Sequence, residues 1–436
     1  MESLPSSYDT RKQGLRTKGL HEAVHHRLGL STKGLPESFN EERHVKSFDS
    51  SRRELMVAAG GIAITGLGWP MGVLGQEPDP LGKDLIFRTT DPRNAEPELA
   101  KLVQSWITPV KHFYVRSHAP NPDIDVNQYA LTLEGRVRNP LTLTRKDLGR
   151  LPRHTVTATL TCAGNRRAEF NQEGKVGGVQ WEAGAIGNAR WSGIALADVL
   201  KQAGVLEDAK HVWFEGLDEI QRKDGVIPFG GSIPLEKAMV QGDLPGALLA
   251  DQMNGQPLTP DHGYPLRTVV PGYIGARSVK WLGKIIVSDR PSPNHYLATA
   301  YKIVKKTDPI DWTESGPIYR YPINGAIATP GPNVAVPAGW LDLSGYVLPT
   351  GRPGSTAKRI QVSADNGVTW ELAQGLGETS EYCWQLWKAR VKVTPRTEAI
   401  LLRAYDNSGG FMPFRVPWNA KGYLQNSWYR LPIRVS

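Results

Sequence analysis

The chain has 436 residues, of which 40% are hydrophobic and 8% aromatic, so it is long enough for two or three globular domains and global disorder is excluded. The formal net charge is +9 at pH 7, but the basic residues are scattered and no recognisable nucleic-acid module accompanies them. We therefore expect no nucleic-acid partner and interpret the charge as favouring anionic ligands. The two cysteines, Cys162 and Cys383, exclude a disulfide framework and a zinc site.

Residues 1–80 are predicted to form a polar segment that contains an export signal. Arg52 and Arg53 precede the modestly apolar, glycine-rich run 57–74. Paired arginines in this position are typical of a twin-arginine signal, with cleavage near Gly75, and a proline inside the run argues against a permanent transmembrane helix. We therefore expect a periplasmic protein, with an uncleaved membrane anchor as the alternative.

Short elements are predicted between this segment and Cys162, because proline-rich and polar breaks interrupt the apolar pattern. They are an extended lead-in over 78–97, a short helix over 98–106, a short strand and polar turn over 113–120, a strand over 129–137, and a turn into a short helix over 141–148. The polar turn contains Arg116, Ser117 and His118. Taken alone, such a cluster is a surface loop.

The stretch around Cys162 combines a thiol with a pair of arginines. In residues 155–160 apolar side chains alternate with threonines, which predicts a strand that delivers Cys162 to its end. Gly164 permits a turn, and Arg166 and Arg167 follow at once. A thiolate is a soft ligand suited to a redox metal, while neighbouring arginines keep it deprotonated and attract an anion. The alternative is a buried strand cysteine followed by solvated arginines.

Two glycine-bearing loops later in the chain are suited to a phosphate. A helix is predicted over 196–203, and a strand over 211–217 is followed by Asp218. The loops 261–267 and 271–281 flank a further strand and carry histidine, arginine, serine and lysine. Backbone N–H groups and cations of this kind surround bound phosphates, but the Walker and Rossmann spacings are absent, so no nucleotide site is indicated.

From residue 317 the pattern changes to short strands separated by turns such as Asp365-Asn366-Gly367, which predicts a β-sandwich of immunoglobulin-like type. Cys383 is interpreted as a core residue of this part. The predicted strands are 323–329, 341–347, 359–363, 370–372, 384–393 and 399–404.

The string Leu-Thr-Cys-Ala-Gly-Asn-Arg-Arg at 160–167 resembles the molybdenum-ligand segment of the sulfite oxidase family, and the resemblance runs from about Thr108 to the C-terminus. It implies an α+β fold, with a molybdopterin-binding catalytic domain over 81–316 and a C-terminal immunoglobulin-like dimerisation domain over 317–436. It also implies one molybdenum held by one pyranopterin dithiolene and by Cys162.

The resemblance assigns site residues as follows. The implied catalytic residues are Arg116, Cys162, Arg167, Tyr301 and Lys421. The implied cofactor-binding residues are Tyr114, Arg116, Ser117, His118, Asp218, His262, Arg267, Ser278, Val279 and Lys280. Two positions depart from the family pattern, because Ser117 replaces an asparagine and Lys421 replaces a substrate-pocket arginine. Lys421 as a solvated loop residue and Tyr301 as a packing residue stay open as alternatives.

The expected reaction is the oxidation of the sulfite anion to sulfate. No Cys-x-x-Cys-His motif for covalently attached haem occurs and no b-type haem domain is visible, so no haem is expected in this chain. Electrons would then pass to an external c-type cytochrome, with oxygen as the alternative. The resemblance also implies a homodimer. A related nitrate reductase, a methionine-sulfoxide-type reductase, an oxidase of another small sulfur compound and a non-enzymatic β-sandwich subunit remain as alternatives.

Overall fold

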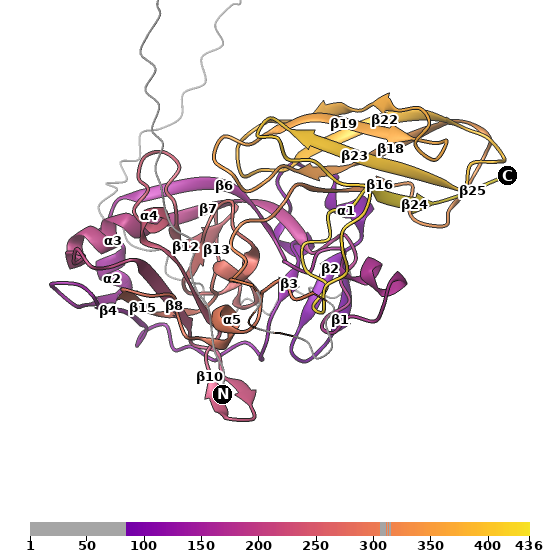
Figure 1. The fold of residues 1–436 in the computed structure, drawn as a ribbon. Helices are drawn as coiled ribbons and strands as arrows, with labels where there is room; N and C mark the ends of the chain where they lie inside the picture. The colour runs from indigo at the N-terminus through magenta and orange to yellow at the C-terminus, as the bar shows by residue number, and fades with distance from the viewer. Residues whose placement is uncertain (1–83, 306–310, 312, 314) are drawn as a thin grey trace, which may run out of the picture. The chain divides into compact units, whose positions relative to one another are not determined.

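The computed structural model describes residues 84–305, 311, 313 and 315–436, so the export signal predicted within residues 1–80 lies outside the described part of the chain. Strands account for most of the secondary structure (Figure 1). Among the described residues the longest helix is α3 (Leu196–Ala203), with eight residues, and no helix is long and apolar enough to span a membrane. The helical part of the predicted α+β fold is therefore small.

One five-stranded sheet carries the largest apolar core. Helix α3 packs its buried face, including Val199 and Leu200, into this core, and it ends at Gly204, whose φ of 68° is the left-handed conformation that glycine favours. The predicted helix over 196–203 is thus confirmed. In sheet order the strands are β11 (Gly230–Pro234), β8 (His211–Gly216), β15 (Leu282–Ser288), β4 (Ala130–Gly135) and β5 (Leu141–Thr144).

A second sheet delivers Cys162. Its strand β6 (Arg153–Thr161) buries alternate residues at first and every residue at its end, where it pairs with β7 (Ile186–Ala195). The predicted strand before Cys162 is confirmed. The remaining strands of this sheet are β12 (Leu248–Met253), β13 (Gln256–Pro257) and β14 (Arg267–Val269), with β13 and β14 both paired to β12.

The proline-rich stretch 78–97 differs from the prediction of a plain extended lead-in. Its described residues form a hairpin of β1 (Leu85–Thr89) and β2 (Asn94–Pro97), and β2 pairs further with β3 (Val115–Arg116). The hairpin forms because β3, about twenty residues further on, supplies a third strand, and a lone hairpin is marginal in water.

Short helices and one hairpin connect the sheets. The helix predicted over 98–106 is only one turn long, whereas the turn predicted within 141–148 is a strand followed by a capped helix, with Thr144 accepting from the Asp147 backbone. These elements are α1 (Leu99–Leu102), α2 (Arg145–Leu148), α4 (Leu235–Ala238), α5 (His295–Ala298), the 3-10 helices η1 (Val110–His112), η2 (Arg167–Gln172), η3 (Pro260–His262) and η4 (Gly275–Arg277), and the hairpin of β9 (Ile220–Arg222) and β10 (Gly225–Ile227).

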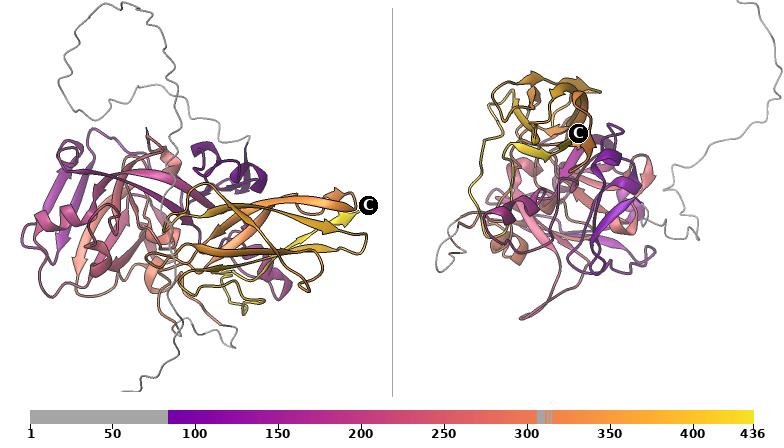
Figure 2. Two further views of the ribbon diagram at one scale, coloured as in Figure 1. Left: turned by 90° about the horizontal axis from the view of Figure 1, so that it is seen from above. Right: turned by 90° about the vertical axis from the view of Figure 1, so that its right-hand side faces the viewer.

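The C-terminal part forms two four-stranded antiparallel sheets that share one apolar core, drawn in orange and yellow in Figure 2. The predicted two-sheet sandwich is confirmed at this level, while its immunoglobulin-like type stays a prediction. One sheet contains β16 (Asn324–Thr329), β18 (Gly339–Leu348), β22 (Gln385–Val393) and β21 (Gln374–Leu376); the other contains β20 (Glu371–Leu372), β19 (Ala357–Ser363), β23 (Ala399–Asp406) and β24 (Tyr429–Pro432). A short parallel pair joins β17 (Ala335–Val336) to β25 (Arg434–Val435).

Candidate active site

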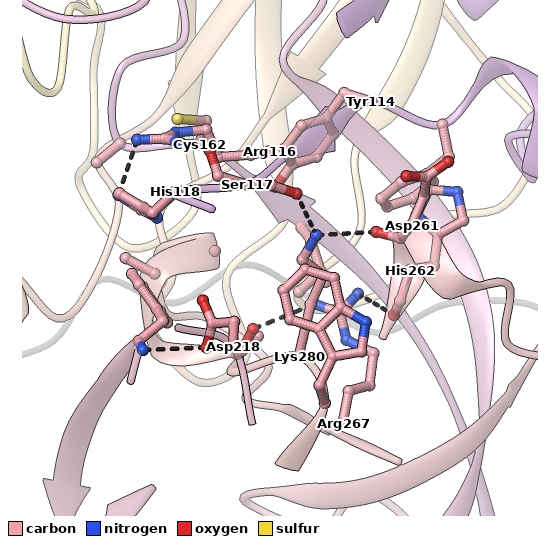
Figure 3. Close-up of a pocket in the computed structure, with 18 of the residues that line it drawn as sticks. Tyr114, Arg116, Ser117, His118, Cys162, Asp218, Asp261, His262, Arg267 and Lys280 are labelled. Carbon is pink, nitrogen blue, oxygen red and sulfur yellow. Dashed lines mark hydrogen bonds between the residues drawn. The ribbon is translucent and has the colours of Figure 1, made fainter. Parts of the chain in front are cut away.

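Cys162 lies at the wall of a pocket of about 670 Å³, a volume that includes the space open to solvent (Figure 3). Its backbone N–H donates to Ala185 O at 2.9 Å, which continues the pairing of β6 with β7, and its side chain is only 7% exposed. The Gly164 N–H points at the sulfur, with an N···Sγ distance of 3.4 Å. The strand end and the turn together fix the thiol at the wall of the pocket.

Side chains from widely separated segments line this pocket. Of the cofactor-binding residues predicted from the sequence, all but Val279 line it, and of the catalytic residues Arg116, Cys162 and Tyr301 do so. The lining residues are Phe113, Tyr114, Arg116, Ser117, His118, Leu160, Cys162, Ala163, Asp218, Phe229, Asp261, His262, Arg267, Gly275, Ala276, Ser278, Lys280, Trp281 and Tyr301.

Near the thiol, Arg116 and Tyr301 both approach the same ring nitrogen of His118. Arg116 Nη2 lies 2.7 Å from His118 Nε2, and the Tyr301 hydroxyl lies 3.2 Å from the same nitrogen. A guanidinium only donates, so Nε2 must accept, which makes His118 a neutral imidazole with its proton on Nδ1. Burial, and then Arg116, holds the pKa of His118 well below 6.5, which agrees with this protonation state.

Since Nε2 has one lone pair and Arg116 already donates to it, the Tyr301 hydroxyl is available to a ligand. Burial raises the pKa of Tyr301, so the hydroxyl keeps its proton. The Arg116 guanidinium is anchored by Asn94 Oδ1 at 3.2 Å and by the carbonyl of Ser117. This end of the pocket therefore offers a cation and a hydroxyl donor beside the thiol.

The opposite side of the pocket contains a second group of cations. Lys280 Nζ donates to Ser117 Oγ at 2.8 Å and to Asp261 O at 2.9 Å (Figure 3). Arg267 donates from Nη1 to His262 O at 3.0 Å and from Nη2 to Ser278 O at 3.2 Å. Because both cations meet carbonyl and hydroxyl oxygens rather than carboxylates in these contacts, their charge is left for an anionic ligand.

Burial shifts the pKa values of this second group. Burial, followed by the charge of Arg267, lowers the pKa of Lys280 to about 7, and burial lowers the pKa of Arg267 to about 10. The pKa of His262 falls to about 4, mainly because of burial and then because of Arg267. Each shift means that the positive form is stabilised too little by the protein alone and that a bound anion would favour it.

Two carboxylates of the pocket play different parts. Asp218 accepts the Phe229 N–H at 3.0 Å, and burial raises its pKa, which fits a carboxylate that meets a ligand donor when the site is filled. Asp261, which the sequence reasoning did not single out, accepts from Arg93 at 2.6 Å and from Asn121 at 2.8 Å. Its signal in the sequence was its position directly before His262.

The two arginines after Cys162 have separate roles. Arg166, with a φ of 66° and no exposed surface, pairs with Glu169 and donates to carbonyls of Ser427 and Trp428 near the end of the chain. Arg167 donates from Nε to Lys421 O and from Nη1 to Val179 O, both at 2.8 Å. No hydrogen bond within the described part of the chain uses its Nη2. Arg166 thus holds the fold together, whereas the Nη2 group of Arg167 is left to donate to a ligand.

Asn165 was also missed by the sequence reasoning. Its Oδ1 accepts the Ala185 N–H at 3.0 Å and its Nδ2 donates to the Tyr346 hydroxyl at 3.0 Å. The Tyr346 hydroxyl in turn donates to Ala183 O at 2.7 Å. A side chain of the C-terminal sandwich therefore takes part in holding the turn that contains Cys162.

Three residues singled out from the sequence do not line the pocket. The Val279 side chain lies in the apolar core and its N–H donates to Thr268 Oγ1 at 2.7 Å, so neither group is free for a cofactor. Arg167 lies beside the pocket, and Lys421 lies next to it, half-buried, with a pKa lowered by burial and then by Arg167. Lys421 is therefore near Arg167 and does not line the cavity.

The residues of the pocket fit a molybdenum cofactor. A soft thiol faces one end, and the cations Arg267 and Lys280 at the other suit a phosphate. The Nε2 atom of His262 is buried and has no hydrogen-bond partner, which marks a place for a ligand atom. A Cβ at Gly275 would lie 2.7 Å from the Tyr114 hydroxyl, so a side chain there would intrude on the wall beside Thr161.

Comparison with known proteins identifies two family models in the chain. Residues 118–296 match the oxidoreductase molybdopterin binding domain, and residues 315–436 match the Mo-co oxidoreductase dimerisation domain. Among curated relatives, the mitochondrial sulfite oxidase of Rattus norvegicus is 40% identical over 80% of this chain, and the sulfite oxidase of Arabidopsis thaliana is 37% identical over 83% of it. The match spans 66% of the rat protein and 96% of the Arabidopsis protein.

A solved structure is similar over most of the chain. The sulfane dehydrogenase SoxCD from Paracoccus pantotrophus matches 84% of this chain and 90% of its own, with a TM-score of 0.65 and 25% sequence identity. The similarity extends into both the part that carries the pocket and the sandwich, since 84% of 436 residues cannot fall within either part alone.

Proposed function

Because the chain belongs to the sulfite oxidase family of molybdopterin oxidoreductases, we propose that it oxidises sulfite to sulfate and passes the electrons to an external acceptor. The observation that carries the proposal is the meeting of Cys162 with Arg116 and Tyr301 in one pocket. A small anion beside the thiol would meet a cation and a hydroxyl donor there, while the other cations of the pocket suit a larger anionic cofactor.

When bound through Cys162, a molybdenum–pyranopterin dithiolene cofactor would supply an oxygen atom and take up two electrons, with the metal passing from +6 to +4. Arg267, Lys280 and His262 would hold its anionic part, and Asp218 would meet its donors. Arg267 and His262 are already fixed by backbone contacts, so they need little rearrangement to do so.

The chain's own residues bind and orient sulfite. Arg116 is fixed by Asn94 and by the neutral His118, so its guanidinium presents a rigid fork to the oxygens of the anion. The Tyr301 hydroxyl, which keeps its proton, donates to another oxygen. Arg167 Nη2 and the Lys421 ammonium add positive charge from the side, which favours a dianion over a neutral sulfoxide.

The test is a steady-state comparison of sulfite, nitrate and methionine sulfoxide with the purified protein, after its molybdenum and pterin content has been measured. We expect turnover with sulfite and none above the Cys162→Ala background with the other two. Turnover of nitrate or methionine sulfoxide alone would replace the proposed substrate, and a protein without molybdenum and pterin would refute an enzymatic role.

We further propose a c-type cytochrome as the acceptor, supported by the positive net charge, which favours an acidic partner. Each sulfite would then reduce two cytochrome molecules. The rate should fall as salt is raised, because encounter of opposite charges is screened. Cytochrome reduction that is slower than oxygen consumption at every salt concentration would favour oxygen instead.

Two further proposals concern assembly and location. The dimerisation domain over 315–436 supports a homodimer, which sedimentation of the purified protein would test against a monomer. Export to the periplasm rests on Arg52 and Arg53. Replacing both by lysine should leave folded protein in the cytoplasm, and an unchanged periplasmic yield would contradict a twin-arginine signal.

A further inference from the structure

The segment 419–424 of the C-terminal sandwich is tied to both sides of the proposed substrate site. It is hydrogen-bonded to the residues that follow Tyr301, to the residue that follows Cys162, and to Arg167. The three bonds are Ala420 N to Val304 O at 2.9 Å, Leu424 N to Ala163 O at 2.8 Å, and Arg167 Nε to Lys421 O at 2.8 Å.

The ring of Tyr423, in the middle of this segment, contacts two of the residues that we assign to substrate binding. It stacks on Tyr301 with a centroid distance of 5.2 Å and an interplanar angle of 14°. The guanidinium carbon of Arg167 lies 5.1 Å from the same ring centroid. Tyr423 is buried and is held at its own backbone by Asn419, which accepts its N–H and donates to its carbonyl, each at 2.9 Å.

Tyr301 needs such a support. Its φ of 53° is a left-handed conformation that is unfavourable for a bulky side chain and persists only where the surroundings hold it. Besides the stacked ring, its side chain has His118 Nε2 at 3.2 Å from its hydroxyl and the Arg277 guanidinium carbon at 5.7 Å from its ring centroid. Arg167 donates hydrogen bonds from Nε and Nη1, and no hydrogen bond among the described residues uses its Nη2. The direction of Nη2 therefore depends on how the plane of the guanidinium is held.

We propose, on the basis of the sulfite oxidation proposed above, that Tyr423 is a positioning residue that fixes the Tyr301 hydroxyl and Arg167 Nη2 relative to one another. It does so with its ring, through stacking on Tyr301 and a cation–π contact with Arg167. The C-terminal sandwich thereby completes the substrate site as well as providing the dimerisation domain.

The chain offers a matched control. Tyr429 lies against Arg166 as Tyr423 lies against Arg167, since the Arg166 guanidinium carbon is also 5.1 Å from the Tyr429 ring centroid. Arg166 is committed to Glu169 and to backbone carbonyls of the sandwich. Loss of the Tyr429 ring should therefore weaken the fold without changing the affinity for the substrate anion.

The experiment compares Tyr423→Leu, Tyr423→Phe and Tyr429→Leu in the full-length holoenzyme. The measurements are kcat, the KM for sulfite, the inhibition constant of sulfate as a non-reacting anion, and Tm. Tyr423→Leu should raise the KM for sulfite and the inhibition constant of sulfate by tenfold or more. Tyr423→Phe keeps the ring, so both constants should stay within threefold of the wild type. Tyr429→Leu should lower Tm and leave both constants within threefold.

Unchanged constants in Tyr423→Leu, or equal defects in the Leu and Phe variants, would overturn a role for the ring. If Tyr423→Leu does not fold, Tyr423→Met, which keeps volume without a ring, takes its place. If the wild type fails to oxidise sulfite, the proposed function falls, but a double-mutant cycle in Tm still decides this inference. Tyr423→Leu and Tyr301→Leu should then combine non-additively while Tyr429→Leu and Tyr301→Leu combine additively, and additivity in both pairs would contradict it.

Discussion

Lys280, one of the two pocket cations that suit a phosphate, should make the free energy of unfolding of the protein depend on pH. The pKa of Lys280 is lowered from 10.5 to about 7, first by burial and then by Arg267. Between pH 7 and 10.5 the unfolded chain therefore binds more protons than the folded chain, so the free energy of unfolding rises with pH across this window. Below pH 7 the ammonium is charged in both states and its burial penalty is fully present.

At about 1.4 kcal/mol per pKa unit, the full window corresponds to about 5 kcal/mol, which is an upper bound because water entering the pocket lowers the penalty. Near pH 8 the contribution of Lys280 should thus be on the order of 1 kcal/mol per pH unit. Lys280→Met keeps the length of the side chain and removes the titrating group. Denaturant unfolding of the cofactor-free chain between about pH 7 and pH 9 measures the slope in both proteins.

We expect a steeper rise of unfolding free energy with pH in the wild type than in Lys280→Met, and the variant should be the more stable of the two at the lower pH. Because every other titrating group is shared, the difference in slope isolates Lys280. Equal slopes would show that the ammonium is already compensated in the empty pocket. The argument that its charge awaits an anionic ligand would then be refuted.

Three further changes test the site. Cys162→Ser should abolish sulfite turnover while circular dichroism and Tm stay near the wild type, since oxygen is a harder ligand than sulfur; activity within a few-fold of wild type would contradict this. Lys421→Ala should raise the KM for sulfite by about 10- to 160-fold, or roughly 1.5–3 kcal/mol, and Lys421→Arg should restore it; unchanged kinetics in both would show that the Lys421 ammonium does not act on the substrate. Tyr346→Phe removes the acceptor of Asn165 Nδ2 and the donor to the Ala183 carbonyl, so it should lower the free energy of unfolding by about 1–3 kcal/mol in denaturant unfolding; an unchanged free energy of unfolding would contradict this.

Local patterns in the sequence were sufficient for the elements that stand directly around the thiol. The alternation before Cys162 predicted β6 because one face of that strand is buried, and the apolar spacing of 196–203 ending at a glycine predicted α3. The turn with Arg116 and His118 was identified through the family resemblance, since in isolation a polar turn of this kind does not differ from a surface loop.

Local sequence patterns could not predict which residues from distant segments of the chain contact one another. Two of the carbonyls that hold Arg166 lie more than 250 residues further along the chain, and no periodicity reports a pairing at that separation. Val279 was assigned to a cofactor, but its backbone N–H donates to the hydroxyl of Thr268, a pairing set by the fold of the loop. The stacking of Tyr423 on Tyr301 likewise depends on how the sandwich meets the pocket.

The partners of Arg166 also bear on the order of events during synthesis. The Trp428 carbonyl that accepts from this arginine is separated from it by 262 residues. At about 5–20 residues per second, a ribosome needs roughly 10 to 50 seconds to reach that residue after the arginine has been made. During this interval the turn after Cys162 lacks its final anchors, and the thiol is open to oxidants that would spoil it as a ligand. A nascent chain held in a reducing compartment until translation ends would keep this thiol intact.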